Sequence, residues 1–320
     1  MDGSRRAVLV ALSANVGIAA AKLVGFLVTG SAALLAETFH SVADTSDQAL
    51  LLLGRWRARR LQTPEHPFGY GRERYFWAFM VAILLFSLGA AGAVREGITH
   101  LVRGEELVEP GWGLGILIVA LLLDSLSLRT AARQAQRGEH GSWWRYVRDT
   151  KQPEISVILL EDSGAVVGVL VAIAGLGLTV LTGDQRYDAA ASIGVGAVLG
   201  VMALILAREM KSLLIGEAAA PEQAEAIREI VRSDSDVRDL VYLRTMHLGP
   251  ESILIEAKVR FGEELASRDV ALAIDRMERR IRSRVDAARV ISIEADVPRS
   301  ADPDMPEWEQ HETSGDAHGR

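Results

Sequence analysis

Six apolar blocks, separated by charged residues, occupy the first two thirds of the chain. Each is close to the roughly 20 residues that an α-helix needs to cross the hydrocarbon core of a bilayer. Their approximate bounds are 7–29, 32–53, 75–94, 112–128, 155–181 and 189–207. The pattern predicts six transmembrane helices in an all-α membrane region, with the lipid bilayer as a partner.

Arginine and lysine are concentrated in alternate connections between these blocks. They gather before the first block and after the second, fourth and sixth, whereas the other connections carry few of them. Because cytoplasmic loops carry the excess of basic residues, both termini are predicted to be cytoplasmic. The first block starts at Ala7 and lacks a clear small-residue cleavage site. It is therefore interpreted as a retained helix, and the plasma (cytoplasmic) membrane is the expected location.

The chain takes on the character of a soluble domain after the sixth block. Its apolar residues follow helical, extended, extended, helical and extended patterns in turn, over 222–232, 237–248, 253–261, 270–281 and 291–295. The predicted fold class is six transmembrane helices followed by a cytoplasmic α+β ferredoxin-like (αββαβ) domain. The predicted boundaries are 1–211 for the membrane domain, 212–297 for the α+β domain and 298–320 for a disordered tail.

A polar edge interrupts the second block. Its members follow one another at spacings of three, four and three residues, with Gln48 beside them: Glu37, His40, Asp44 and Asp47. Residues at these spacings share one face of a helix. Each acidic group near the centre of a spanning helix costs roughly 2.5 to 3.5 kcal/mol on insertion scales. A stripe of this kind is therefore expected to have a function.

The fifth block carries two adjacent acids, Glu161 and Asp162, inside a run of aliphatic residues. At 1.5 Å per residue, Asp44 lies roughly 16 Å below the outer surface of a core about 30 Å thick, and Asp162 about 10 Å above the inner one. His40, Asp44 and Asp162 are therefore predicted to meet and to offer a nitrogen and two carboxylate oxygens, a set that suits zinc. The fourth ligand is left open between Glu161, Gln48 and water.

Other polar groups in the blocks leave alternatives open. Glu37 and Asp47 are candidates for the two mouths of a proton pathway. Asp124, in the fourth block, is either a proton-carrying site or a helix contact. Lys22, in the first block, either reaches the membrane interface or pairs with an acid. Glycines four residues apart in the fifth and sixth blocks predict close helix packing without chemistry.

Composition narrows the possible functions. The chain has no cysteine, so disulfides, thiolate nucleophiles and cysteine zinc sites are excluded, and a metal has to be held by His, Asp and Glu. The net charge of -7 gives no support for nucleic acid binding. The sequence contains neither a His-Glu-x-x-His nor a Gly-x-Ser-x-Gly motif. We therefore expect no enzyme activity and no permanently bound cofactor.

Four features occur together in this chain: "HSVAD" in the second block, "EHPFGYGRERYFW" after it, "LLEDS" in the fifth block and the α-β-β-α-β module. In this combination the chain resembles the cation diffusion facilitator transporters, and most closely their zinc transporter nine-like branch. The resemblance runs from about Ala7 to Val297. It implies a homodimer that exchanges a divalent metal, usually zinc, for protons. It also places His40 and Asp44 in the metal motif of the second helix and Asp162 in that of the fifth.

The chain departs from this family pattern at several metal positions. Many members have His four residues before the fifth-helix Asp, where this chain has Ile158. Bacterial relatives bind zinc in the C-terminal module, and the comparable positions here are Val241, Glu256, Glu294 and the retained Asp296. A regulatory metal site in the module is therefore not expected, nor is an accessory metal at His66 in the loop after the second block.

These observations together predict a divalent metal efflux transporter. Metal binding requires neutral His and ionised carboxylates, so loading of the metal releases protons, and the transported Zn²⁺ and the coupled protons use the same site. Alternating access between the second and fifth helices completes the prediction. The alternative is a non-transporting membrane receptor or scaffold with a vestigial metal site, which Ile158 favours.

Overall fold

A computed structural model of the chain describes residues 2–103, 110–136 and 153–296. The chain divides into two compact units, of which the first comprises Met1–Leu61 and Glu73–Ser212. The second begins at Leu213 and also takes in the short segment Gln62–Arg72. The predicted tail at 298–320 lies outside the described residues.

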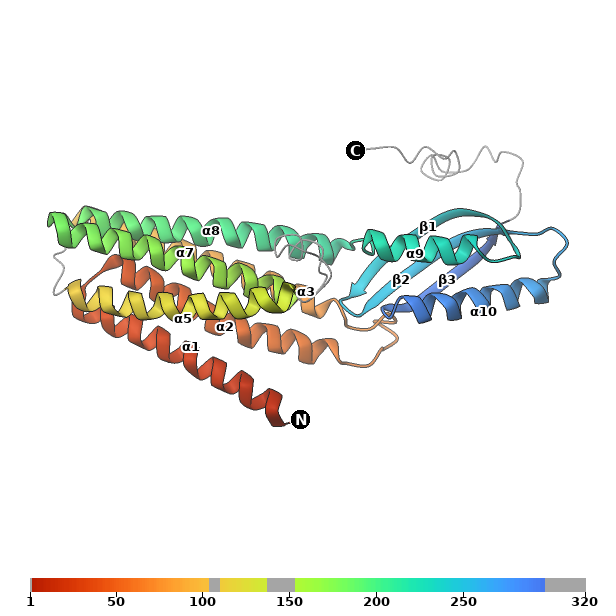
Figure 1. Ribbon diagram of the computed structural model, residues 1–320, viewed down its shortest axis with the longest axis horizontal. Coiled ribbons are helices and arrows are strands. Elements are labelled where there is room, and N and C mark those ends of the chain that lie inside the picture. Colours follow the sequence, from red (N-terminus) through yellow and green to blue (C-terminus); the bar gives the residue numbers. More distant parts are fainter. Residues whose placement is uncertain (1, 104–109, 137–152, 297–320) are drawn as a thin grey trace. The chain divides into compact units, whose positions relative to one another are not determined.

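The first unit is a bundle of long helices that lie side by side (Figure 1). Its elements are α1 Asp2–Thr29, α2 Ala32–Ala58, α3 Glu73–Leu84, the π-helical segment η1 Leu85–Ala90, α4 Ala91–Arg103, α5 Pro110–Gln136, α7 Pro153–Thr182 and α8 Arg186–Ile215. The segments α3, η1 and α4 follow one another without a break. Each apolar block of the sequence lies within one of these helical stretches.

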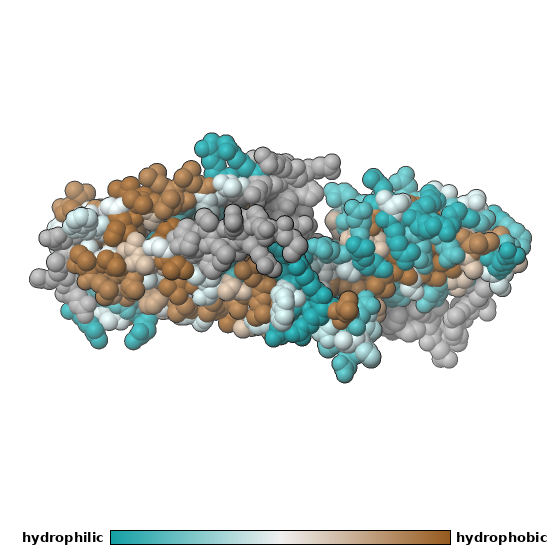
Figure 2. Space-filling model, turned by 90° about the horizontal axis from the view of Figure 1, so that it is seen from below, coloured by the Kyte–Doolittle hydropathy of each residue, from teal (hydrophilic) through white to brown (hydrophobic). Residues whose placement is uncertain are grey.

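In the part of the chain that the structure describes, four helices are long and apolar enough to cross a membrane. They are Glu73–Arg103, Gly111–Thr130, Ser156–Thr182 and Arg186–Ile215. The helix α2 falls short of this criterion because it carries Glu37, Asp44 and Asp47. Large apolar side chains cover much of the visible surface of the bundle (Figure 2), as expected of helices that face lipid. The protein is thus a membrane protein, and the count of six spans stays a prediction.

The helix α2 is held at its first turn by the helices around it. Gly30, with φ of 68°, makes the tight turn from α1 that a side chain would strain. Ser31 caps α2 by accepting a hydrogen bond from the Leu34 N–H, and its own hydroxyl donates to Asp188 Oδ1 of α8 at 2.6 Å. The Ala33 N–H donates to the other Asp188 oxygen. An acid at a helix N-terminus is also favoured by the helix dipole.

Along its length α2 packs against α1, α3, η1, α4 and α7. Small residues allow the close approaches, because a Cβ atom at Gly54 would lie 3.0 Å from Trp77 of α3. A Cβ atom at Gly92 of α4 would lie 3.3 Å from the Phe39 ring of α2. Of the polar stripe, Glu37, His40 and Asp47 are buried within the bundle and Asp44 is partly exposed.

The second unit is a small α+β domain. Its elements are α9 Pro221–Arg232, β1 Val237–Gly249, β2 Ser252–Phe261, α10 Ser267–Arg284 and β3 Ala288–Asp296. The strands form a sheet in the order β1-β2-β3, with β1 antiparallel and β3 parallel to β2. This is the predicted order of elements, and the ferredoxin-like class stays a prediction.

Period-two burial along β2 builds the core of this domain. Ile253, Ile255, Ala257 and Val259 are buried and alternate with residues that are partly exposed. They form one cluster with buried residues of the two helices, including Ile227, Val231, Ala273, Met277 and Ile281. The alternation of the sequence therefore identifies the face of β2 that carries the core.

A charged contact joins the C-terminal end of α9 to α10. Arg276 donates to both oxygens of Asp234, at 2.8 and 2.6 Å, and also to Asp236. The Arg276 guanidinium lowers the pKa of Asp234 below its ordinary value. The contact therefore stabilises the fold above the ordinary carboxyl range, and this stabilisation is lost as the pH falls through the lowered pKa.

We expect Arg276→Gln to weaken the α9–α10 contact by roughly 1.5–3 kcal/mol at pH 7, because Asp234 loses its two short bonds to Arg276 and keeps only the longer contact with Arg280, at 3.9 Å. The difference from the wild-type chain should shrink below about pH 4, where the carboxyl group protonates. Hydrogen exchange of α9 and α10 in the full chain measures both effects. Arg279→Gln, an exposed change on the same helix, is the control and should leave exchange unaltered.

Candidate metal centre

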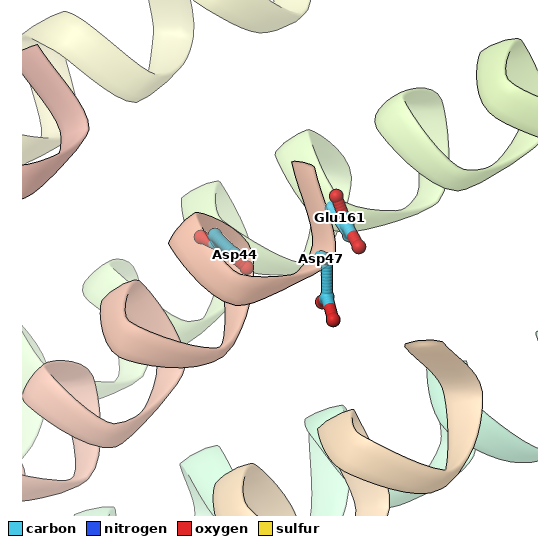
Figure 3. Close-up of side chains that lie close together, drawn as sticks. All are labelled: Asp44, Asp47 and Glu161. Carbon is cyan, nitrogen blue, oxygen red and sulfur yellow. The ribbon is translucent and has the colours of Figure 1, made fainter. Parts of the chain in front are cut away.

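Three acidic side chains meet where α2 packs against α7. One carboxylate oxygen from each of Asp44, Asp47 and Glu161 lies within 4.8 Å of the other two. Figure 3 shows Glu161 of α7 beside Asp47 of α2, with Asp44 about one turn along the same helix. Asp47 is fully buried and Glu161 is 6% exposed. These three residues are called the carboxylate cluster below.

The carboxylate cluster is short of hydrogen-bond donors. Both oxygens of Asp47 and Oε1 of Glu161 are buried without a hydrogen-bond partner among the described residues. A buried carboxylate without a partner costs several kcal/mol. The cluster therefore favours any species that neutralises it, either a divalent cation or protons shared between neighbouring carboxyl groups.

His40 lies next to the carboxylate cluster. Its Nδ1 is 3.3 Å from Asp44 Oδ1, and the ring is 1% exposed. Neither ring nitrogen has a hydrogen-bond partner in the described part of the chain. His40 and Asp44 are thus brought together, as expected of residues four apart on one helix face.

Asp162 has a different environment. Its Oδ2 accepts a hydrogen bond at 2.9 Å from the Ser127 hydroxyl of α5. It is close enough to Asp44 to interact electrostatically but does not belong to the carboxylate cluster. The joint metal site of His40, Asp44 and Asp162 therefore stays a prediction.

The remaining ligand candidates lie on the same two helices. Glu161, one of the open choices for the fourth ligand, is a member of the carboxylate cluster. Gln48 is partly buried on α2 and stays an open candidate. Ile158 is 41% exposed on α7. Its apolar side chain offers no ligand atom.

The open alternative for Lys22 is resolved in favour of pairing. Its ammonium lies 2.9 Å from Glu37 Oε2, and the side chains are 1% and 0% exposed. The two residues stand at nearly equal distances from the Gly30 turn, which places them side by side on α1 and α2. This symmetry was the signal in the sequence that would have predicted the pair. Glu37, expected at one mouth of a proton pathway, is thus held by a cation.

The Lys22–Glu37 pair also explains a glycine of α7. A Cβ atom at Gly168 would lie 2.6 Å from Glu37 Oε1. Gly168 was expected only to allow close packing, but it also makes room for a carboxylate. Asp124 of α5 keeps one buried oxygen without a partner among the described residues and is near Lys22 and His40. These contacts do not distinguish between a proton-carrying role and a helix contact for Asp124.

In the C-terminal unit, Glu256 and Asp296 contact other side chains of the same domain. Tyr242 donates to Glu256 Oε1 at 3.2 Å, and burial together with that carboxylate raises the pKa of Tyr242 to about 12. Asp296 pairs with Arg260 at 3.1 Å and lies 3.9 Å from the Lys258 ammonium. None of these acids belongs to a three-ligand cluster in the described residues.

Two histidines of the described residues, His66 and His247, lie outside the bundle and have local contacts. His66 stacks on Tyr70, with ring centroids 4.5 Å apart. His247 is buried at the end of β1, where its Nδ1 lies 3.3 Å from the Gly249 carbonyl oxygen. Both contacts are local, within the loop after α2 and at the end of β1.

A bundle of apolar helices that encloses unpaired carboxylates and an imidazole defines a membrane protein that handles cations. A family model described as the cation efflux transmembrane domain matches residues 8–215. The chain belongs to this family, the cation diffusion facilitators.

Several curated relatives give the same result. The chain is 32% identical over 271 residues to the proton-coupled zinc antiporter SLC30A9, mitochondrial, of Xenopus laevis, covering 84% of this chain and 48% of that protein. It is 30% identical over 267 residues to metal tolerance protein C4 of Arabidopsis thaliana, covering 82% of this chain and 58% of that protein. It is 26% identical over 273 residues to the cation-efflux pump FieF of Serratia proteamaculans, covering 84% and 85%. The chain spans about half the length of the SLC30A9 proteins it matches.

Proposed function

We propose that this protein exports a divalent cation, most readily zinc, in exchange for protons. The observation that carries the proposal is the group of buried, unpaired carboxylates beside His40 between α2 and α7. His40, Asp44 and Asp162 are proposed as the metal ligands, with Glu161 and Gln48 as further candidates. The name of the SLC30A9 relatives supports both zinc and proton coupling.

Exchange follows from the chemistry of the ligands. A metal ion binds neutral imidazole and ionised carboxylates, and protons bind the same atoms. Occupation by one therefore expels the other. Alternating exposure of the site to the two sides of the membrane converts this competition into coupled transport. We propose that α2 and α7 move relative to each other during this cycle.

We propose six transmembrane spans, cytoplasmic termini, a homodimer, and a ferredoxin-like C-terminal domain at 212–297. The plasma (cytoplasmic) membrane is proposed as the location, and the SLC30A9 relatives are named as mitochondrial. Glu37, Asp47 and Asp124 are proposed as proton-pathway residues, with Glu37 bound to Lys22 in this conformation.

Zinc uptake by liposomes tests the function. Liposomes that contain the protein and are more acidic inside than outside are expected to accumulate zinc, and Asp162→Asn is expected to abolish this uptake. Ser163→Ala is the control, because the Ser163 hydroxyl bonds only within its own helix, to the Leu159 carbonyl oxygen. Uptake by Asp162→Asn at the wild-type rate would remove Asp162 from the site.

The alternative is a membrane receptor or scaffold with a vestigial site, which Ile158 favours. It predicts no proton-driven zinc flux in the wild-type protein, even when the protein is correctly inserted and folded. The same liposome measurement therefore separates the two functions.

A further inference from the structure

We propose that Asp44, Asp47 and Glu161 form a second cation position, made of carboxylate oxygens alone, on the cytoplasmic side of the predicted His40–Asp44–Asp162 site. The proposal rests on the proposed function, because the second position is an additional binding site for the transported cation on the same pathway. It differs from the predicted site in two of its three residues.

The dimensions of the carboxylate cluster suit a single divalent cation. Such ions bind carboxylate oxygens at about 2.0–2.6 Å, so two ligand atoms of one ion lie at most about 5 Å apart. The oxygens of the cluster lie within 4.8 Å of one another. One cation therefore reaches all three carboxylates with only small side-chain movements.

Burial and missing partners indicate a ligand and not a structural contact. Asp47 is fully buried, and neither of its oxygens has a hydrogen-bond partner in the described residues. His40 supplies a separate observation. It is almost fully buried, both its nitrogens lack partners, and its Nδ1 lies 3.3 Å from Asp44. Asp44 thus connects the carboxylate cluster to the His40 imidazole, and both carry ligand atoms without hydrogen-bond partners among the described residues.

The order of the two positions follows from the helix directions. With both termini cytoplasmic, α2 runs toward the cytoplasm and Asp47 lies about 4.5 Å beyond Asp44. The helix α7 runs the other way, and Glu161 precedes Asp162. Both helices therefore place the additional acid on the cytoplasmic side. A cation that comes from the cytoplasm meets the carboxylate cluster before the imidazole.

The donor set determines which cations the second position accepts. Carboxylate oxygens suit hard cations such as Mn²⁺, whereas an imidazole favours zinc. The carboxylate cluster is thus a weakly selective entry position, and the discrimination in favour of zinc is assigned to the step that brings the cation to His40.

Mn²⁺ binding to the detergent-solubilised full chain, followed by electron paramagnetic resonance, tests the second position directly. We expect Asp47→Asn and Glu161→Gln each to lower Mn²⁺ affinity at least about tenfold. His40→Gln should keep Mn²⁺ binding within about threefold of the wild type but lose zinc uptake in liposomes. Asp184→Asn, an exposed acid outside the cluster, is the control for binding to surface carboxylates and should change nothing.

The outcomes separate this inference from the proposed function. Mn²⁺ affinity that is unchanged in both Asp47→Asn and Glu161→Gln would overturn the second position, whether or not the wild type transports zinc. Equal loss of Mn²⁺ binding in His40→Gln would also overturn it, because one joint site would then account for all binding. Asp47→Glu keeps the charge and is expected to retain binding, which distinguishes ligand loss from misfolding.

Discussion

Asp44→Asn is expected to abolish zinc transport, with the initial rate of uptake by liposomes falling at least about 100-fold. Asp44 is the one residue shared by the His40 contact and the carboxylate cluster. The substitution keeps the shape of the side chain but removes the charge and one ligand oxygen. Both proposed positions on the pathway therefore lose a ligand at once.

Thr45→Val is the matched control for Asp44→Asn. Thr45 is the next residue along α2, and its hydroxyl bonds to the Ser41 carbonyl oxygen of the same helix. We expect its uptake rate to stay within about twofold of the wild type. If Asp44→Asn kept more than a tenth of the wild-type rate, Asp44 would not be a ligand in transport.

Gly168→Ala is expected to destabilise the bundle by roughly 2–4 kcal/mol and to slow transport. The added methyl group would lie 2.6 Å from Glu37 Oε1, so the Glu37 carboxylate, whose other oxygen is bound to Lys22, has to shift. Overpacking of this kind costs roughly 1–3 kcal/mol, and separating a buried ion pair adds to the cost. Thermal unfolding of the solubilised protein measures the loss.

Gly177→Ala is the matched control on the same helix. A Cβ atom at this position has nothing within 4 Å, and alanine favours a helix over glycine by about 1 kcal/mol. This variant is expected to be as stable as the wild type or more so. Equal behaviour of the two alanine variants would contradict the role given to Gly168.

The sequence predicted one side of the candidate site better than the other. Glu37, His40, Asp44 and Asp47 share a face of α2 because their spacing is a property of any helix. The partner face on α7 could not be predicted in this way, because Glu161 and Asp162 are neighbours that point about 100° apart. Which of them meets α2 depends on the rotation of α7, and that rotation is set by packing.

The packing of α7 shows how this rotation is decided. Ile158 and Asp162 are four residues apart and share a face. In the structure Ile158 is exposed and Asp162 bonds to Ser127 of α5, while Glu161 joins the carboxylate cluster. A single sequence does not show which face of α7 packs against α2 and which against α5. Helix depth and the family resemblance both pointed to Asp162, whereas Glu161 was only one of the open choices for the fourth ligand.

The soluble unit was easier to predict, because alternation along β2 and the helical stripe of α10 are local patterns. Its ion pairs were not predicted. Asp296 had been compared with a metal ligand of relatives, and it pairs with Arg260 across neighbouring strands. Such pairs depend on strand register, which the sequence of one strand does not define.

Asp188 accepts hydrogen bonds from the Ser31 hydroxyl and the Ala33 N–H, and these bonds hold the first turn of α2 in place. Sliding of the helix along its own axis would break these bonds, whereas tilting about this end would not. The carboxylate cluster lies 13 to 16 residues further along, on a lever arm of about 20–24 Å. A tilt of only about 5° would move the cluster by about 2 Å, the length of one metal–oxygen bond. A small change of angle at the first turn of α2 is therefore enough to alter the geometry of the proposed cation position deep in the bundle.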